Sequence, residues 1–163
     1  MQRRTFLATA IGALATAGCM PEGKLLQVTA PPTTPPRAKI ERVLIWLSPN
    51  ITLASEKLGD AFVAAFAPYS VPVKVGRASA LELNRGDDQA KPMTEIQATH
   101  RLEIEVGSFR SGGGIPAEWT LVVSLYAGKD RRPLMALQYR PAGFSDNTVA
   151  TVVVQKLHEY GYL

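Results

Sequence analysis

The sequence predicts an α/β (α+β) fold built on a single mixed β-sheet, and three observations carry this prediction. An unbroken apolar run at residues 43–47 is typical of a strand covered on both faces. Residues 101–106 alternate between apolar and charged side chains, as in a strand with one face in water. Segments 58–66 and 145–160 place apolar residues at helical spacing. With 163 residues, the chain has the size of one ordinary domain.

The first predicted unit is a β-α-β arrangement. Strand 43–47 ends at Ser48-Pro49-Asn50, and a helix follows that Thr52 or Ser55 could cap and Pro68 is expected to stop. The apolar stripe of this helix consists of Leu58, Ala61, Phe62, Ala65 and Phe66. Residues 71–77 form the next strand, and a right-handed crossover would make the two strands parallel.

The polar stretch at 78–98 is expected to be irregular. It holds a turn cluster at 84–88 and at most a helical turn at 93–98.

An antiparallel β-β-β meander follows. In its first strand one face carries apolar and the other charged residues, namely Leu102, Ile104 and Val106 against Arg101, Glu103 and Glu105. Ser111 to Gly114 reads as a flexible connection, and Trp119–Ala127 as the second strand, with Trp119, Leu121, Val123 and Leu125 on one face. A turn at 128–132 leads to the third strand, 134–139.

A helix from Ser145 to Tyr160 closes the predicted fold. Ser145, Asp146 or Asn147 can cap it, Gly161 ends it, and its stripe is Val149, Val152, Val153, Leu157 and Tyr160. Each predicted helix has one apolar stripe, so both can cover the same face of the sheet. The opposite face would carry Arg101, Glu103 and Glu105, and the apolar tail 160–163 could dock on the sheet or on a partner.

The amino terminus has the pattern of a removable signal peptide at 1–18. A short basic start precedes an uncharged run from Thr5 to Gly18, which is too short to span a bilayer. Thr16-Ala17-Gly18-Cys19 resembles the bacterial lipobox, although Thr16 stands where a large apolar residue is usual. A buried thiol or a reactive thiol would need the cysteine inside a folded domain, so we predict that Cys19 is lipidated (palmitate among the acyl chains).

The leader also resembles the twin-arginine export motif through Arg3, Arg4, Phe6 and Leu7. A general secretion leader that happens to begin with two arginines is an equal alternative. Met20 follows the cysteine in place of the aspartate that tends to retain lipoproteins at the inner membrane in enteric bacteria. By that resemblance we expect the periplasmic face of the outer membrane, with the inner membrane as the alternative.

Residues 19–39 are predicted to be a lipidated tether, and residues 40–163 a single periplasmic domain. Pro31 to Pro36 favours an extended polyproline II conformation, and twenty such residues could span up to ~60 Å. A docking strip for an aromatic groove is the alternative to a spacer. Leu25, Leu26 and Val28 could add a short strand or pack on the domain.

The distribution of charge speaks against nucleic-acid binding. The formal net charge is +4, but residues 40–163 hold 13 basic and 13 acidic residues, so the excess lies in the leader and tether. A local basic group at Lys129, Arg131 and Arg132 reads as a solvated turn.

No catalytic constellation is evident. His100 and His158 are the only histidines, and neither has a partner motif, so we expect structural roles. The pair Asp87-Asp88 reads as part of a polar turn, and the glycines after Ser111 lack the ending of a phosphate loop. We therefore predict no enzyme activity and no catalytic, cofactor-binding or metal site. Aromatic residues near strand ends could be core rims or contact anchors: Tyr126, Tyr139, Tyr160, Tyr162, Phe109 and Phe144.

The lipobox leader, the Pro-rich stretch, the element order, "ATHRLEIEV" (98–106) and "LHEYGYL" (157–163) together resemble a loose group. These are the small envelope lipoproteins with a domain similar to the TolB amino-terminal part, CsgG and PelC. The PqiC-like auxiliary lipoproteins of ABC-type lipid transporters are close competitors. The resemblance implies a non-enzymatic accessory subunit of an envelope secretion, transport or assembly complex, which could be a homo-oligomer. The alternative is a periplasmic lipoprotein that binds a lipid or another small ligand.

Overall fold

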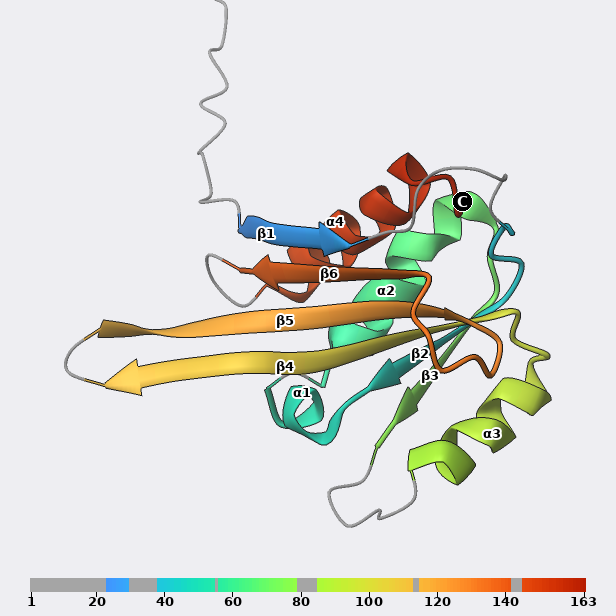
Figure 1. The fold of residues 1–163 in the computed structure, drawn as a ribbon, viewed down its shortest axis with the longest axis horizontal. Helices are drawn as coiled ribbons and strands as arrows, with labels where there is room; N and C mark the ends of the chain where they lie inside the picture. Colours follow the sequence, from blue (N-terminus) through green and yellow to red (C-terminus); the bar gives the residue numbers. More distant parts are fainter. Residues whose placement is uncertain (1–22, 30–37, 55, 79–84, 113–114, 142–144) are drawn as a thin grey trace, which may run out of the picture.

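The computed structural model describes residues 23–29, 38–54, 56–78, 85–112, 115–141 and 145–163. Its strands form one six-stranded sheet in the order β1-β6-β5-β4-β2-β3 (Figure 1). β2 pairs in parallel with β3 and β4, and the remaining pairs are antiparallel, so the predicted mixed sheet is confirmed. The strands are β1 (Lys24–Thr29), β2 (Val43–Leu47), β3 (Val73–Arg77), β4 (His100–Gly112), β5 (Ile115–Ala127) and β6 (Met135–Arg140).

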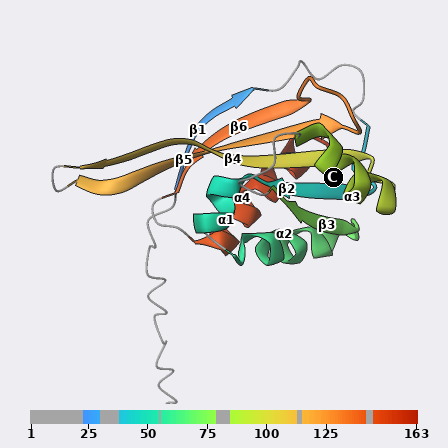
Figure 2. The same cartoon turned by 90° about the horizontal axis from the view of Figure 1, so that it is seen from below.

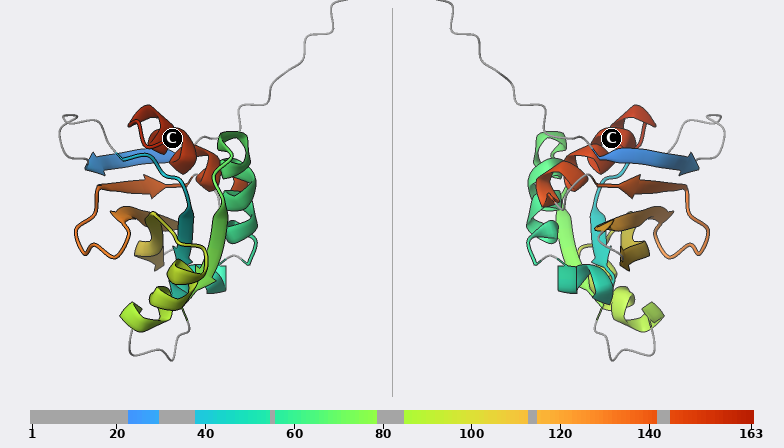
Figure 3. Two further views of the ribbon diagram at one scale, coloured as in Figure 1. Left: turned by 90° about the vertical axis from the view of Figure 1, so that its right-hand side faces the viewer. Right: turned by 90° about the vertical axis from the view of Figure 1, so that its left-hand side faces the viewer.

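Helices cover both faces of this sheet. They are α1 (Pro49–Ala54), α2 (Leu58–Phe66), α3 (Arg85–Glu95) and α4 (Asp146–Glu159), and a 3-10 turn at Ala67–Tyr69 follows α2. As predicted, α2 and α4 lie side by side on one face, and α1 lies on the same side (Figure 2). The end-on views in Figure 3 show α2 and α3 on different sides of β2 and β3.

The main core lies between the sheet and α2 and α4. The predicted stripe of α2 is buried there, with Leu58, Phe62 and Phe66 fully inaccessible, and burial of each such side chain contributes ~1.5–3 kcal/mol. β2 alternates between two cores. Val43, Ile45 and Leu47 belong to the main core, whereas Leu44 and Trp46 form a smaller cluster with Met93 of α3.

The stretch at 78–98 is a correction to the sequence prediction. Instead of a polar turn cluster and a single helical turn, residues 85–95 form α3, with Asp87 and Asp88 in its first turn. The sequence did not predict this helix for two reasons. Pro92 lies inside it, and Met93 is a single buried apolar residue, which makes no apolar stripe at helical spacing. Acidic residues in a first turn suit the helix dipole, which is the signal that could have revealed α3.

The predicted helix caps are also corrected in detail. Residues 49–54 form a separate short helix, and the N-cap of α2 is Lys57, so neither Thr52 nor Ser55 caps α2. Pro68 lies within the 3-10 turn that follows α2. Ser145 does occupy the N-cap of α4, but its Oγ accepts a hydrogen bond from Thr148 Oγ1 at 3.1 Å and caps no backbone N–H.

The presence of β1 in the sheet changes how the Pro-rich stretch is interpreted. Residues 24–29 pair with β6, which is one of the two expected alternatives for Leu25, Leu26 and Val28. The stretch 31–36 therefore connects two strands of one sheet and does not by itself hold the sheet away from a membrane. The distance from Cys19 to the sheet is set by the residues before Lys24, which can span about 17 Å. The division of the chain at residues 18 and 39 stays a prediction.

The carboxyl-terminal tail packs on its own domain, which is one of the two alternatives expected from the sequence. Tyr162 is buried in the main core, and its hydroxyl donates a hydrogen bond to the carbonyl of Leu134 at 3.1 Å. The carbonyl of Tyr162 accepts a hydrogen bond from the backbone N–H of Ile40 at 2.9 Å. Gly161 ends α4 with a positive φ of 79°, a conformation that favours glycine.

Candidate functional site

The most distinctive surface is a two-stranded arm formed by the outer halves of β4 and β5. Both strands have 13 residues, far more than their neighbours. β2 pairs with β4 only as far as Ile104, and β6 pairs with β5 only from Leu121 onward. We call residues 105–112 and 115–120 the arm, because there β4 and β5 pair only with each other. Figure 1 shows it projecting beyond the other strands.

The arm arises because both neighbouring strands are followed by a proline. The last ladder bond from the β2 side runs from the backbone N–H of Ser48 to the carbonyl of Ile104 at 3.0 Å, and Pro49 then begins α1. β6 ends at Arg140, and Pro141 follows. Proline has no N–H to donate to a ladder. The two flanking strands therefore stop within two residues of each other along the ribbon, while β4 and β5 continue.

A bulge lies at the base of the arm. The register of β4 and β5 shifts between Val106 and Ser108, where Gly107 is the extra residue. A Cβ built on Gly107 would lie 2.6 Å from Cγ2 of Val122, so the strands approach closely here. Bulges bend a strand and increase its twist. The bulge therefore sets the direction in which the arm leaves the sheet.

The backbone register brings aromatic and charged positions of the arm together. Phe109 lies opposite Trp119, and Arg110 lies opposite Glu118. Ser108, which precedes these pairs, is exposed. The sequence had singled out Phe109 and Trp119 but placed Ser111 to Gly114 in a loop. In the structure, β4 continues through Gly112, and Gly113 and Gly114 lie outside the described residues.

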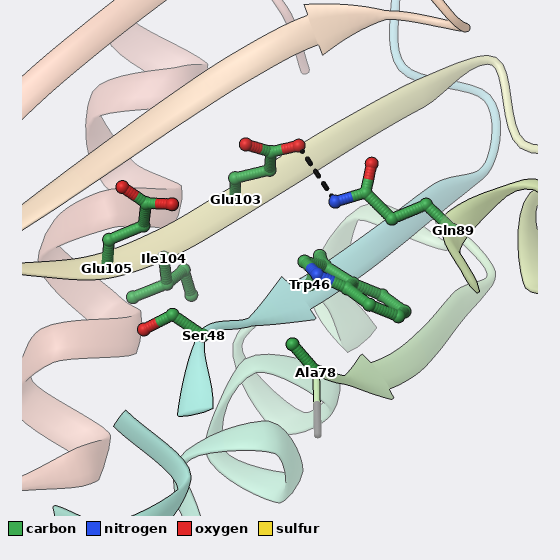
Figure 4. A pocket seen from close by; sticks show the side chains of 7 residues that line it. All are labelled: Trp46, Ser48, Ala78, Gln89, Glu103, Ile104 and Glu105. Carbon is green, nitrogen blue, oxygen red and sulfur yellow. Dashed lines mark hydrogen bonds between the residues drawn. The ribbon is translucent and has the colours of Figure 1, made fainter. Parts of the chain in front are cut away.

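A second candidate site is a small pocket on the face of the sheet that α3 covers. Its volume is about 160 Å³, and its walls come from β2, β4, α3 and the residues that follow β2 and β3 (Figure 4). The lining residues are Trp46, Ser48, Ala78, Gln89, Glu103, Ile104 and Glu105. Ligand sites for drug-sized molecules have volumes of ~300–1,000 Å³. This pocket is too small to enclose a lipid.

A buried ion pair neutralises one wall of the pocket. Oε1 of Glu103 accepts hydrogen bonds from Nε of Arg101 at 2.7 Å and from Nε2 of Gln89 at 3.0 Å (Figure 4 shows the latter). Arg101 is 9% exposed and also donates to the carbonyls of Gly128 at 3.2 Å and Asp130 at 3.4 Å. This network ties α3, β4 and the β5–β6 turn together. It has the character of a structural joint more than that of an acid-base pair.

The face of the sheet that was predicted to carry charged side chains of β4 is therefore only partly exposed to water. Arg101, Glu103 and Glu105 do lie on the face opposite the main core, but α3 buries Arg101 and half-buries the two glutamates. The guanidinium of Arg101 lies 4.5 Å from the ring centre of Tyr126. Burial, followed by the nearby charge of Glu103, raises the pKa of Tyr126 above its ordinary value.

The two histidines have different environments, and neither lies in the arm or lines the pocket. His100 is 2% exposed at the start of β4, whereas His158 is exposed on α4, with its ring 5.4 Å from that of Tyr69. Within the part of the chain that the structure describes, no group of three His, Cys, Asp or Glu side chains could hold a metal ion.

The remaining predicted residues are placed as follows. Lys129, Arg131 and Arg132 lie exposed in the β5–β6 turn, as expected. Tyr139 and Tyr162 are core residues, while Tyr126 and Tyr160 are half-buried; Phe144 is not among the described residues. Cys19 and the export residues Arg3, Arg4, Phe6 and Leu7 also lie outside the described ranges. None of the helices in those ranges is both long and apolar enough to cross a membrane.

Comparisons with known proteins identify similar structures but no family. No family model matches the chain, and no curated protein matches it. A PelC dodecamer from Paraburkholderia phytofirmans, carrying a point substitution, is 14% identical with a TM-score of 0.49, and covers 83% of this chain and 95% of its own. A second PelC dodecamer from the same organism is 12% identical with a TM-score of 0.48, covering 86% and 97%. At these values the likeness assigns no partner, substrate or assembly to this chain.

Proposed function

We propose that this chain is a lipid-anchored periplasmic accessory subunit of an envelope secretion, transport or assembly complex, and that it acts by binding. The observation that carries the proposal is the arm. A two-stranded ribbon is marginally stable by itself in water because it cannot bury its own faces. A chain that extends such a ribbon beyond its sheet presents strand edges and faces that a partner can cover.

The backbone of the arm offers two free edges. Among the described residues, no strand pairs with β4 beyond Ile104 in place of β2, although α1 contacts β4, and none pairs with β5 before Leu121 in place of β6. A partner strand placed along either edge would continue a ladder that Pro49 or Pro141 interrupts. Main-chain hydrogen bonds of this kind supply affinity, and the alternating side chains supply specificity.

The proposed anchor and the arm belong to the same end of the sheet. Lys24, the first residue of β1, lies opposite Arg140 of β6, and the adjacent Tyr139 lies opposite Leu121 at the base of the arm. Lipidation of Cys19 would therefore hold the base of the arm close to the membrane. The Cys19 lipobox and the residue after it support the outer membrane as the location.

Two variants test the two parts of the proposal separately. Cys19→Ser should move the protein from the membrane fraction to the soluble periplasm, because it removes the acyl attachment. The second variant deletes residues 108–119 and joins Gly107 to Thr120 through an Asn-Gly hairpin turn. It should keep the membrane location and the folded domain but elute alone from detergent-solubilised envelopes, whereas the intact chain elutes in a complex.

A matched control changes the opposite end of β5. Alanine substitutions at Lys129, Arg131 and Arg132 alter an exposed turn without touching the arm. This variant should remain in the complex. An intact chain that elutes as a monomer, or an armless chain that still elutes in the complex, would contradict the proposal.

A further inference from the structure

His100 is a buried titratable group that the proposed function does not use. Its side chain is 2% exposed, and Nδ1 lies 3.0 Å from Oγ1 of Thr99. Nε2 is buried and has no hydrogen-bond partner among the described residues. This holds for either tautomer of the neutral ring.

Thr99 joins this ring to the segment that leads into β2. Its Oγ1 accepts hydrogen bonds from the backbone N–H groups of Glu41 and Arg42, each at 3.2 Å, and donates to the carbonyl of Arg42 at 3.1 Å. The backbone N–H groups of Thr99 and His100 also donate to that carbonyl, at 3.0 and 3.2 Å. One carbonyl and one hydroxyl thus carry most of the attachment of residues 41–42.

The same segment holds the carboxyl-terminal tail. The N–H of Ile40 donates to the carbonyl of Tyr162 at 2.9 Å, and Nζ of Lys39 lies 2.6 Å from the carbonyl oxygen of Leu163. We call residues 39–42, together with their bonds to Thr99 and to residues 162–163, the clasp. The clasp fastens the connection from β1 to both the start of β4 and the end of the chain.

We propose that His100 makes the clasp acid-sensitive, so that it is closed while the ring is neutral and opens when the ring is protonated. The imidazolium carries an N–H on both nitrogens. In the closed clasp, the proton on Nε2 would face no acceptor, and the charge would lie in a buried site. Because Nδ1 contacts Oγ1 of Thr99, to which residues 41 and 42 are hydrogen-bonded, opening of the clasp would give this side of the ring access to water.

Few charged groups face the ring to offset this cost. In the clasp, Glu41 is exposed and its charge favours the imidazolium, whereas the two basic residues Lys39 and Arg42 offer it no negative charge. β2 and β5 contribute the uncharged residues Val43 and Ala127 opposite His100. The neighbouring Arg101 extends to the other face of the sheet, where it binds Glu103. Burial therefore outweighs Glu41, and the pKa of His100 lies below its ordinary value of 6.5.

The direction of the pH effect follows from this shift. Below the ordinary pKa, a released histidine binds a proton that the closed clasp excludes, so closure loses stability as the pH falls. Closure is fully stable above that value and weakens through pH 6.5 toward the lower pKa of the closed state. For each pH unit in this interval the ratio of closed to open forms decreases by up to about tenfold.

Hydrogen exchange on the mature, detergent-solubilised protein tests the proposal. After correction for intrinsic exchange rates, the peptide covering 38–43 should lose protection between pH 7.5 and 5.0. A peptide from β5 covering 121–127 should keep its protection. His100→Gln should abolish this pH dependence, and His158→Gln, which changes an exposed histidine, should preserve it.

If His100→Gln does not fold, titration of the His100 ring tests the proposal instead. The chain has only two histidines, so the ring signals of the His158→Gln protein belong to His100. They should titrate below 6.5, with the same midpoint as the amides of Ile40 and Arg42, and Glu41→Gln should lower that midpoint further. Protection that is equal at both pH values, or a ring that titrates at or above 6.5, would overturn the proposal.

Discussion

The inner and outer halves of the β4–β5 ribbon differ in the elements that surround them. In the inner half, Leu102, Ile104 and Leu121 have no exposed surface, because β2 and β6 flank the ribbon and α2 and α4 cover it. In the outer half, Gly107 and Ser108 are exposed. Strand formation therefore continues past the point where the sheet, and with it the core, has ended.

This difference shows that the end of a sheet can be decided by its flanking strands. Pro49 and Pro141 end the ladders on each side, while β4 and β5 continue past this point, and the proline in β5, Pro116, lies next to the outer end of that strand. The arm is thus a consequence of the neighbours' sequences. The inner half should carry stability and the outer half binding, and the following substitutions separate the two.

The largest effect on stability is expected from Leu102→Ala in the inner half. Leu102 is completely buried in the main core, and truncation of such a residue leaves a cavity that costs about 2–5 kcal/mol. Urea denaturation should show this loss. Ser108→Ala on the arm should stay within about 0.5 kcal/mol of the wild type. Equal losses for the two variants would mean that the arm shares the core's stability.

A smaller loss is expected from Arg101→Ala on the second face of the inner half. It removes the hydrogen bonds from Arg101 to the carbonyls of Gly128 and Asp130, and it leaves Gln89 as the donor to Glu103 among the described residues. The free energy of unfolding should decrease by about 2 kcal/mol. Lys74→Ala breaks the more exposed ion pair with Glu95 and should cost clearly less, because water and salt screen that pair. A larger loss for Lys74→Ala would contradict the role of Arg101 as a joint.

A moderate loss of stability is expected from Gly107→Ala at the boundary between the halves. The added methyl group would press on Cγ2 of Val122, and overpacking of this kind costs about 1–3 kcal/mol. Thermal unfolding should register this loss, and partner binding should weaken because the arm changes direction. Unchanged binding with a changed bulge would show that the direction of the arm is unimportant.

Much of the fold could be predicted because local patterns and tertiary burial agree. The apolar run of β2, the stripe of α2 and the alternation in 101–106 each required burial on the side where the structure provides it, whereas the face that α4 buries is shifted from its predicted stripe toward Ala150 and Val154. α3 escaped prediction because one internal proline and a mostly polar sequence obscured a helix held by Met93 and Gln89.

The arm escaped prediction for a different reason. A glycine-rich sequence such as Ser111 to Gly114 normally indicates a loop, and the residues before it lack the strict alternation that a core imposes. The informative signal was nonlocal, since Pro49 and Pro141 act on β4 and β5 only through strand pairing. The attachment of residues 39–42 to Thr99 and Tyr162 is likewise invisible in the sequence, because it joins segments more than 50 residues apart.

Site-specific photo-crosslinking in living cells tests the central claim, that the arm is the binding surface of an envelope subunit. A photoreactive amino acid at Ser108 lies exposed on the arm, and one at Arg131 lies exposed in the turn at the other end of β5. The account predicts a discrete crosslinked product of defined mass from position 108 in the membrane fraction, and none from position 131. The same product from both positions, or from neither, would contradict it.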